Sequence, residues 1–106
     1  LVSLGPETAI ITDGKNGAYC YDKTYYYHVK PRKIRVKETT GAGDAFASGF
    51  VSGIIMGKGT DFCLRLGMHN AESVVQHNGA KHVILSKKEA LKLVKKDKRR
   101  IEKRKI

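Results

Sequence analysis

A glycine-rich turn, Thr39-Thr40-Gly41-Ala42-Gly43-Asp44, runs directly into an apolar stretch that continues to Met56. The stretch predicts a buried helix over 45–56, too short to span a membrane, which takes about 20 residues. Small residues recur at every fourth position of this region, at Ala45, Gly49, Gly53 and Gly57. Such a ridge lets a second backbone approach closely. We therefore expect a tightly packed helix that begins at a turn with little side-chain bulk.

The turn has the features of a phosphate site. Gly41 and Gly43 remove side chains that would keep an anion from the backbone, and the first turn of a helix has amides without intrahelical partners. The helix dipole also favours negative charge there. A carboxylate at Asp44 would repel a bound phosphate, so a loop that only binds an anion would not favour Asp there. A general base that accepts a proton from a substrate hydroxyl would explain its presence. The sequence thus predicts phosphoryl transfer, with Asp44 as base and the amides of Gly41, Ala42 and Gly43 as anion hole.

A purely structural interpretation stays open from these residues alone. Thr39 or Thr40 would cap the helix, and Asp44 would only favour its positive end.

The run Glu38-Thr39-Thr40-Gly41-Ala42-Gly43-Asp44 resembles the second signature of the PfkB, or ribokinase-like, carbohydrate kinases, usually written D-T-x-G-A-G-D. In that family the last Asp is the catalytic base and the G-A-G amides form the anion hole. The resemblance carries these roles onto Asp44 and onto residues 41–43, while Glu38 replaces the usual Asp. It implies an α/β fold, the C-terminal portion of a three-layer α/β/α domain, and a kinase that uses ATP with Mg²⁺. The family's upstream Asn-x-x-Glu motif, associated with magnesium, is absent from this sequence.

A hairpin is predicted near the start of the chain. Residues 9–12 and 18–21 read as strands on either side of a glycine turn. Hairpins of this kind are common. In PfkB kinases, however, a T-x-G-x-x-G turn at this distance before G-A-G-D lies along the nucleotide, and the resemblance implies ATP contacts from Thr12, Asp13, Gly14, Lys15, Asn16 and Gly17. Lys15 is otherwise read as an exposed hairpin lysine.

A later helix, over 64–77 and ending near Gly79, resembles the family helix that packs beside the adenine. Met68 stands where ribokinases often carry Asn, with Asn70 two residues later, and the resemblance implies that either lines the adenine pocket. Some members also bind a potassium-like ion through loops that correspond here to Glu38, Thr40, Val74, His77 and Gly79. Glu38 is one methylene longer than the family's Asp, which moves an oxygen ligand.

The chain has 106 residues, the size of one domain. A PfkB kinase is much longer and the chain begins with Leu1, so we expect a C-terminal piece, with nucleotide binding in 1–86 and a terminal basic helix in 87–106. The family's N-terminal sugar-binding signature and lid strands are absent. The acceptor, a sugar or a nucleoside, is therefore not defined, and a homodimer of the full-length protein is implied by the resemblance.

The other strands and helices are predicted from residue alternation, from proline and from helix-capping residues. Strands are predicted over 25–29, 34–36 and 83–85, with Pro31 marking an interruption. Thr60 is the predicted cap of the helix at 64–77, and Ser86-Lys87-Lys88-Glu89 has the spacing of a capping box. Three consecutive tyrosines, Tyr25 to Tyr27, alternate between the faces of a strand, which favours packing over a flat base-stacking platform.

Charge is concentrated at the end of the chain. The sequence has 21 Lys and Arg against 10 Asp and Glu, a net charge of +11, and residues 87–106 alone carry +8. Leu91, Val94 and Ile101 on one side predict an amphipathic helix whose upper part docks and whose end extends into solvent. Its basic blocks are read first as a solvated tail. The alternative function is a kinase-like binding module whose basic tail engages nucleic acid.

The cysteines and histidines show no metal pattern. Cys20 and Cys63 lack C-x-x-C spacing and are read as reduced packing residues, and the histidines form no i, i+4 pair, so no structural zinc is assigned. Because the cysteines are read as reduced, a cytoplasmic setting is expected.

Overall fold

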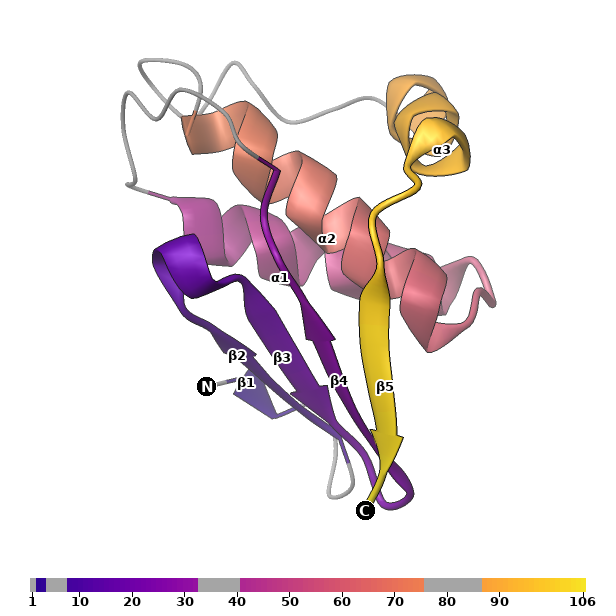
Figure 1. Cartoon of the computed structure of the whole chain (residues 1–106). Helices are drawn as coiled ribbons and strands as arrows, with labels where there is room; N and C mark the ends of the chain where they lie inside the picture. The colour runs from indigo at the N-terminus through magenta and orange to yellow at the C-terminus, as the bar shows by residue number, and fades with distance from the viewer. Residues whose placement is uncertain (1, 4–7, 33–40, 76–86) are drawn as a thin grey trace. The chain divides into compact units, whose positions relative to one another are not determined.

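The computed structural model describes residues 2–3, 8–32, 41–75 and 87–106 (Figure 1). Contacts divide the chain into two compact units, one of residues 1–31 with 99–106 and the other of residues 32–98. The expected strands at 34–36 and 83–85, the capping box at Ser86 and the expected boundary at residue 86 lie outside the described residues.

The first unit is a five-stranded antiparallel sheet whose strands lie in sequence order. Its strands are β1 (Val2–Ser3), β2 (Ala9–Thr12), β3 (Ala18–Tyr21), β4 (Tyr25–Val29) and β5 (Ile101–Lys105), and a short 3₁₀ helix, η1 (Gly14–Asn16), joins β2 to β3. The strands predicted at 9–12, 18–21 and 25–29 are confirmed.

Alternate residues of the strands are buried, as expected for a sheet with one packed face. Ile10, Cys20 and Tyr27 are cross-strand neighbours and are all buried. The next residues along the strands are more exposed and carry aromatic rings, with Tyr19 stacked on His28 at 4.4 Å. The ring of Tyr26 lies with Tyr19 and Tyr21, whereas the rings of Tyr25 and Tyr27 lie together, so the three consecutive tyrosines alternate between the faces of the strand as predicted.

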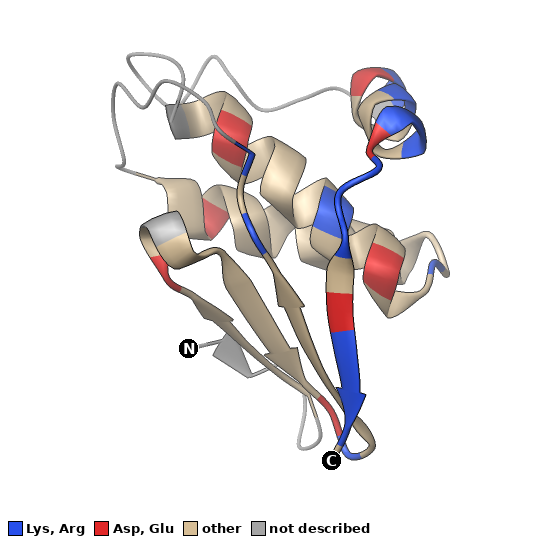
Figure 2. Ribbon diagram, viewed as in Figure 1, with Lys and Arg blue, Asp and Glu red and all other residues tan. Residues whose placement is uncertain are grey.

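The expectation of one basic helix over 87–106 is wrong for its second half. The helix ends at Lys96, where the Asp97 N–H donates to the Val94 carbonyl at 3.1 Å. Residues 101–105 form β5 along β4, with Ile101 opposite Val29 (Figure 1). The physical reason is that β4 would otherwise present a row of unpaired backbone groups. Figure 2 shows Lys and Arg along this strand, so the basic tail is part of the sheet.

The second unit contains α1 (Ala42–Ile55), α2 (Thr60–Val75) and α3 (Lys87–Lys96). α2 begins one residue earlier than a Thr60 cap requires, because the Cys63 N–H already bonds to the Gly59 carbonyl at 3.1 Å. A small apolar core joins α2 and α3 through Leu66, Ala90 and Val94. The amphipathic character predicted for the start of the last helix is confirmed by these contacts.

The small-residue ridge of α1 packs on α2. A β-carbon on Gly49 would lie 2.9 Å from the Cα of Gly67, and one on Gly53 would lie 2.6 Å from the sulfur of Cys63. Gly57 has a different role from the one expected, because it follows the helix with φ 74°. Its N–H donates to Ile54 and the next amide to Gly53, which is the hydrogen-bond pattern of a Schellman cap.

Within the described residues, every helix is too short or too polar to span a lipid bilayer. Cys20 and Cys63 form no disulfide among the described residues and both are buried, as predicted for packing residues. Burial raises the pKa of the Cys63 thiol above its ordinary value.

Candidate active site

The start of α1 holds the predicted phosphate turn. Gly41 is the cap residue and has φ 85°, a left-handed conformation that glycine adopts without strain. The first intrahelical bond runs from the Ala45 N–H to the Gly41 carbonyl at 2.9 Å. The amides of Ala42, Gly43 and Asp44 precede that bond, and no described side chain caps them. The turn therefore offers backbone donors at the positive end of a 14-residue helix.

Asp44 lies in the first turn of α1, and its side chain is exposed. Gly43 beside it is exposed as well, so a ligand could reach both the amides and the carboxylate from solvent. A phosphate bound by the amides would thus lie close to the solvent-accessible carboxylate of Asp44.

The predicted nucleotide turn is a self-contained structure in the sheet unit. The Asp13 backbone N–H donates to the Gly17 carbonyl at 2.8 Å, and the side-chain Nδ2 of Asn16 donates to the Asp13 carboxylate at 3.0 Å. A β-carbon on Gly17 would fall 2.0 Å from the Val29 carbonyl, so this position must be glycine. Thr12 and Gly14 are exposed, and the side chain of Lys15 is not among the described ones. Hairpin geometry alone accounts for much of this pattern.

Met68 and Asn70 are both buried in α2. The Asn70 amide nitrogen packs against Gly49 of α1, and its Oδ1 has no hydrogen-bond donor among the described residues. A buried acceptor without a partner is costly, so Asn70 stands out from the apolar residues around it.

The predicted ligands of a monovalent cation cannot be placed together. Glu38, Thr40, His77 and Gly79 lie outside the described residues, and Val74 is buried in α2. The described part of the chain contains no group of three or more His, Cys, Asp or Glu residues suited to a metal ion.

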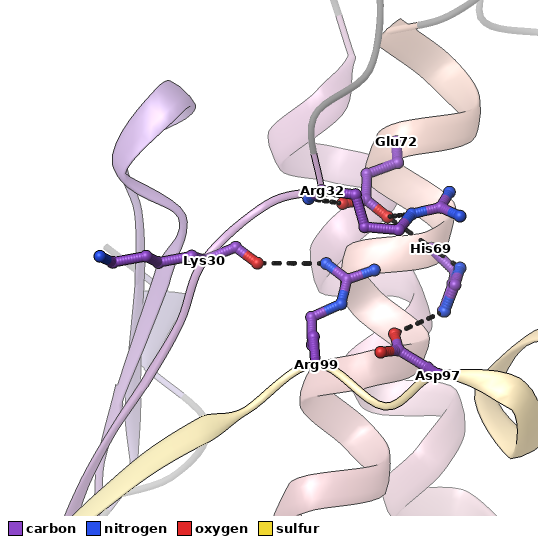
Figure 3. A network of polar contacts seen from close by, with 6 residues as sticks. All are labelled: Lys30, Arg32, His69, Glu72, Asp97 and Arg99. Carbon is purple, nitrogen blue, oxygen red and sulfur yellow. Dashed lines mark hydrogen bonds and ion pairs between the residues drawn. The ribbon is translucent and has the colours of Figure 1, made fainter.

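Sequence reasoning missed a buried polar network on α2 (Figure 3). The Glu72 carboxylate accepts hydrogen bonds from the Arg32 backbone N–H at 2.8 Å and from its Nε at 2.9 Å. His69, one turn earlier, lies with Nε2 2.7 Å from the Asp97 carboxylate. The side chains of Glu72, His69 and Asp97 are each only 3% exposed. The sequence does place an acid, Glu72, among the apolar residues of the predicted helix. Its partner Arg32 lies 40 residues away in the sequence, so the pairing could not be predicted.

The described fold has the architecture of a known class of kinases. The structure of a ribokinase from Arabidopsis thaliana, complexed with ribose and ATP, matches 86% of this chain and 30% of that chain with a TM-score of 0.76 and 29% identity. A nucleoside kinase from Methanocaldococcus jannaschii, an archaeal member of the ribokinase family, matches 86% of this chain and 31% of that chain, with a TM-score of 0.77 and 25% identity. The fold is therefore ribokinase-like and of the α/β class.

Sequence comparison gives the family. Residues 1–88 match the pattern of the pfkB family carbohydrate kinases, and the chain belongs to this family. A 2-dehydro-3-deoxygluconokinase from Haemophilus influenzae is 39% identical over 83 residues, which are 76% of this chain and 26% of that protein. The chain thus spans about a third or less of the relatives that it matches.

Proposed function

We propose that this chain supplies the phosphate-binding part of an ATP-dependent phosphotransferase that acts on a hydroxyl group of a sugar or nucleoside. The observation that carries the proposal is the start of α1, where free amides and an exposed carboxylate share one turn. Membership of the pfkB family and the likeness to a ribokinase solved with ribose and ATP support it.

In the proposed reaction, Asp44 accepts the proton of the acceptor hydroxyl while that oxygen attacks the γ-phosphorus of ATP. The bond from the γ-phosphorus to the β-phosphate oxygen breaks, and ADP leaves. The amides of Gly41, Ala42 and Gly43 would donate to the oxygens of the moving phosphoryl group. Because these donors are fixed in the backbone, they need no reorganisation as negative charge builds up.

The ATP-binding roles of the 12–17 turn, Met68 and Asn70 remain part of the proposal. Gly14 is exposed with open space beside its Cα, so it keeps the backbone accessible, and the unpartnered Oδ1 of Asn70 supports a contact with a group outside the described residues. Mg²⁺, which in such sites is bound largely by substrate phosphates, would reduce the charge of ATP. No described residue is assigned to it or to K⁺.

The acceptor is proposed only as a class. The relatives named above include a kinase of a sugar acid, a ribokinase and a nucleoside kinase, and all three substrates offer a hydroxyl group. A homodimer of the complete protein and a cytoplasmic location belong to the same proposal. Nucleic-acid binding through the basic segment remains the alternative, with that segment a strand paired with β4 and not an extended tail.

The test is Asp44→Asn in the complete protein that carries this chain. We expect phosphoryl transfer to fall by roughly 10²- to 10⁴-fold, the usual contribution of a general base. ATP affinity, measured by calorimetry, should stay close to that of the wild type, because the amides that bind phosphate are unchanged.

The matched control is Asp61→Asn. Asp61 is also an exposed acid in the first turn of a helix, α2, and any effect through the helix dipole should be similar at both positions. If Asp44→Asn retains as much turnover as Asp61→Asn, Asp44 only stabilises its helix and the catalytic assignment is lost.

A further inference from the structure

The sheet unit carries a row of aromatic rings that the proposed mechanism does not use. Residues directly opposite each other on neighbouring strands share a face of the sheet. Tyr21 of β3 lies opposite Tyr26 of β4, and Tyr19 lies opposite His28. The ring of Tyr26 lies 5.2 Å from that of Tyr21 and 6.3 Å from that of Tyr19, measured between centres. Tyr19 in turn stacks on His28 at 4.4 Å. The four rings therefore form one continuous aromatic face.

Solvent reaches this aromatic face. Tyr21 is 38% exposed, and the other three rings are partly exposed. Ile11 of β2, which lies opposite Tyr19, extends the face and is 36% exposed. The residues that point to the other side of the same strands, such as Cys20 and Tyr27, are buried. A continuous apolar patch on a protein surface often marks a binding site, so the aromatic face is a candidate for one.

A basic strand borders the aromatic face. Arg104 of β5 lies opposite Tyr26, so it continues the line of side chains that starts at Tyr21. The Arg104 side chain is 72% exposed, and its Nε lies 3.1 Å from the carboxylate of Glu102, which is also exposed. Such surface ion pairs are weak, so a phosphate can replace the carboxylate. With a net charge of +11 on the chain, the ligand that suits this surface is an anion with flat rings.

We propose that the aromatic face binds single-stranded nucleic acid, with bases against the rings of Tyr21 and Tyr26 and a backbone phosphate on the guanidinium of Arg104. Exposed aromatic rings beside basic side chains are the usual elements of such sites, because every nucleotide offers a flat base and a negative charge. Stacking accepts any base, so the binding has little sequence preference. This function is separate from phosphoryl transfer, which is assigned to other residues.

The first experiment measures the binding of a fluorescently labelled RNA of about 12 uridines to the complete protein by anisotropy. Arg104→Gln should weaken binding roughly 3- to 10-fold and lower the slope of log Kd against log salt concentration by about 0.7, the value for one phosphate contact on a single strand. The matched control is Lys105→Gln, which removes one charge from the same strand. Lys105 lies opposite Tyr25, outside the aromatic face, so its loss should weaken binding less.

The second experiment removes a ring. Tyr21→Leu keeps an apolar side chain at an exposed position, and the affinity for the same RNA should fall roughly 5- to 100-fold, the usual loss for one stacked base. The control is Tyr25→Leu, because the ring of Tyr25 lies with that of Tyr27 and not with the aromatic face.

A third variant should change affinity in the opposite direction. Glu102→Gln removes the carboxylate that competes with a phosphate for Arg104, so it should tighten RNA binding by a few fold. General destabilisation of the sheet cannot produce a gain of affinity, so this variant keeps the test decisive if Tyr21→Leu does not fold.

Equal losses of affinity in Arg104→Gln and Lys105→Gln, or wild-type affinity in a folded Tyr21→Leu protein, would overturn the proposal, because binding would then depend on net charge alone. Poly-glutamate that displaces the RNA at an equal concentration of charge would overturn it as well and would indicate an acidic protein as the partner. Absence of RNA binding at low salt would also overturn it. None of these results affects the proposed phosphoryl transfer, which is tested at Asp44.

Discussion

Two carboxylates on adjacent helices, Asp44 on α1 and Glu72 on α2, have opposite environments. Asp44 is exposed at the start of α1, where water and a substrate can reach it. Glu72 is buried and bonded through both oxygens to Arg32. A group that exchanges protons needs access to its partner, whereas a group that fixes the backbone gains strength from exclusion of water. These environments support Asp44, and not Glu72, as the proton acceptor that we propose.

Cys63 gives a prediction for pH dependence at the same scale. Its pKa is raised by burial above the ordinary value of 9.0, so the folded state resists ionisation of the thiol. Below pH 9.0 the thiol is protonated in both states and adds no pH dependence. Above it only the unfolded chain loses the proton, so stability falls as pH rises toward the folded pKa, by at most ~1.4 kcal/mol per pH unit.

The measurement is urea unfolding from about pH 8 to about pH 10 for the wild type and for Cys63→Ala. Other groups that ionise in this range affect both proteins equally, so the difference in slope belongs to Cys63. Identical slopes would contradict the raised pKa.

Residues of this kind differ in how visible they are in the sequence. Asp44 could be singled out as a candidate base because the glycines that suggest a phosphate site, Gly41 and Gly43, are its neighbours in the sequence. Glu72 could not, because Arg32 is brought to it only by the fold. Gly57 was predicted only in part. Its four-residue spacing suggested that it belonged to the small-residue ridge of the helix, whereas it adopts a left-handed conformation that ends the helix, which spacing does not predict.

At the scale of elements, the contact between α1 and α2 determines where the phosphate turn lies. The helices approach so closely at Gly49 that a β-carbon there would lie 2.9 Å from the Leu66 carbonyl and from the Gly67 Cα. These are backbone atoms, so they cannot move aside as a flexible side chain could. The whole helix must shift instead.

Gly49→Ala is therefore expected to destabilise the protein by about 1–3 kcal/mol, the usual cost of overpacking, although alanine is the better helix former. Ser48→Ala, at an exposed position next to it, should change stability by less than about 0.5 kcal/mol. Chemical denaturation of both variants makes the comparison. A stabilised Gly49→Ala protein would mean that the helices are further apart than described.

The elements themselves were largely predictable from local pattern. The strands of the hairpin and β4 follow from alternation and glycine turns, and α1 and α2 follow from their apolar and small residues. β5 could not be predicted, because residues 101–105 have the composition of a charged tail and become a strand only beside β4. Strand pairing between distant segments leaves little trace in the sequence of either one.

At the scale of the whole molecule, residues from both ends of the chain belong to one sheet, with β1 and β5 at its opposite edges. β5 pairs with all five residues of β4, the Ile106 N–H donates to Thr24 O at 2.8 Å, and Arg99 donates to Lys30 O at 3.2 Å. Lys103 places its ammonium 4.2 Å from the centre of the Tyr25 ring. The last eight residues are therefore structural.

A chain shortened to end at Lys98 should lose several hydrogen bonds of about 1 kcal/mol each and melt at a lower temperature. The chain has five Tyr and no Trp, and every tyrosine lies in the sheet unit, so intrinsic fluorescence reports on this unit alone. Replacing Lys103, Arg104 and Lys105 by Gln removes the charge and the Lys103–Tyr25 contact but keeps the strand, and should lower the melting temperature much less than the truncation does. A shortened chain that melts like the wild type would show that β5 adds nothing to the sheet.

The charges of β5 also bear on how the protein behaves in concentrated solution. Among the described strands β5 lies at an edge, so two copies meeting edge to edge would bring like charges within the strand spacing of about 4.8 Å. Ionic screening extends over about 8 Å at physiological salt and about 3 Å at 1 M. Repulsion between like charges therefore opposes self-association through this edge at low salt. At about 1 M salt the repulsion is screened, so we expect self-association through this edge to increase with ionic strength.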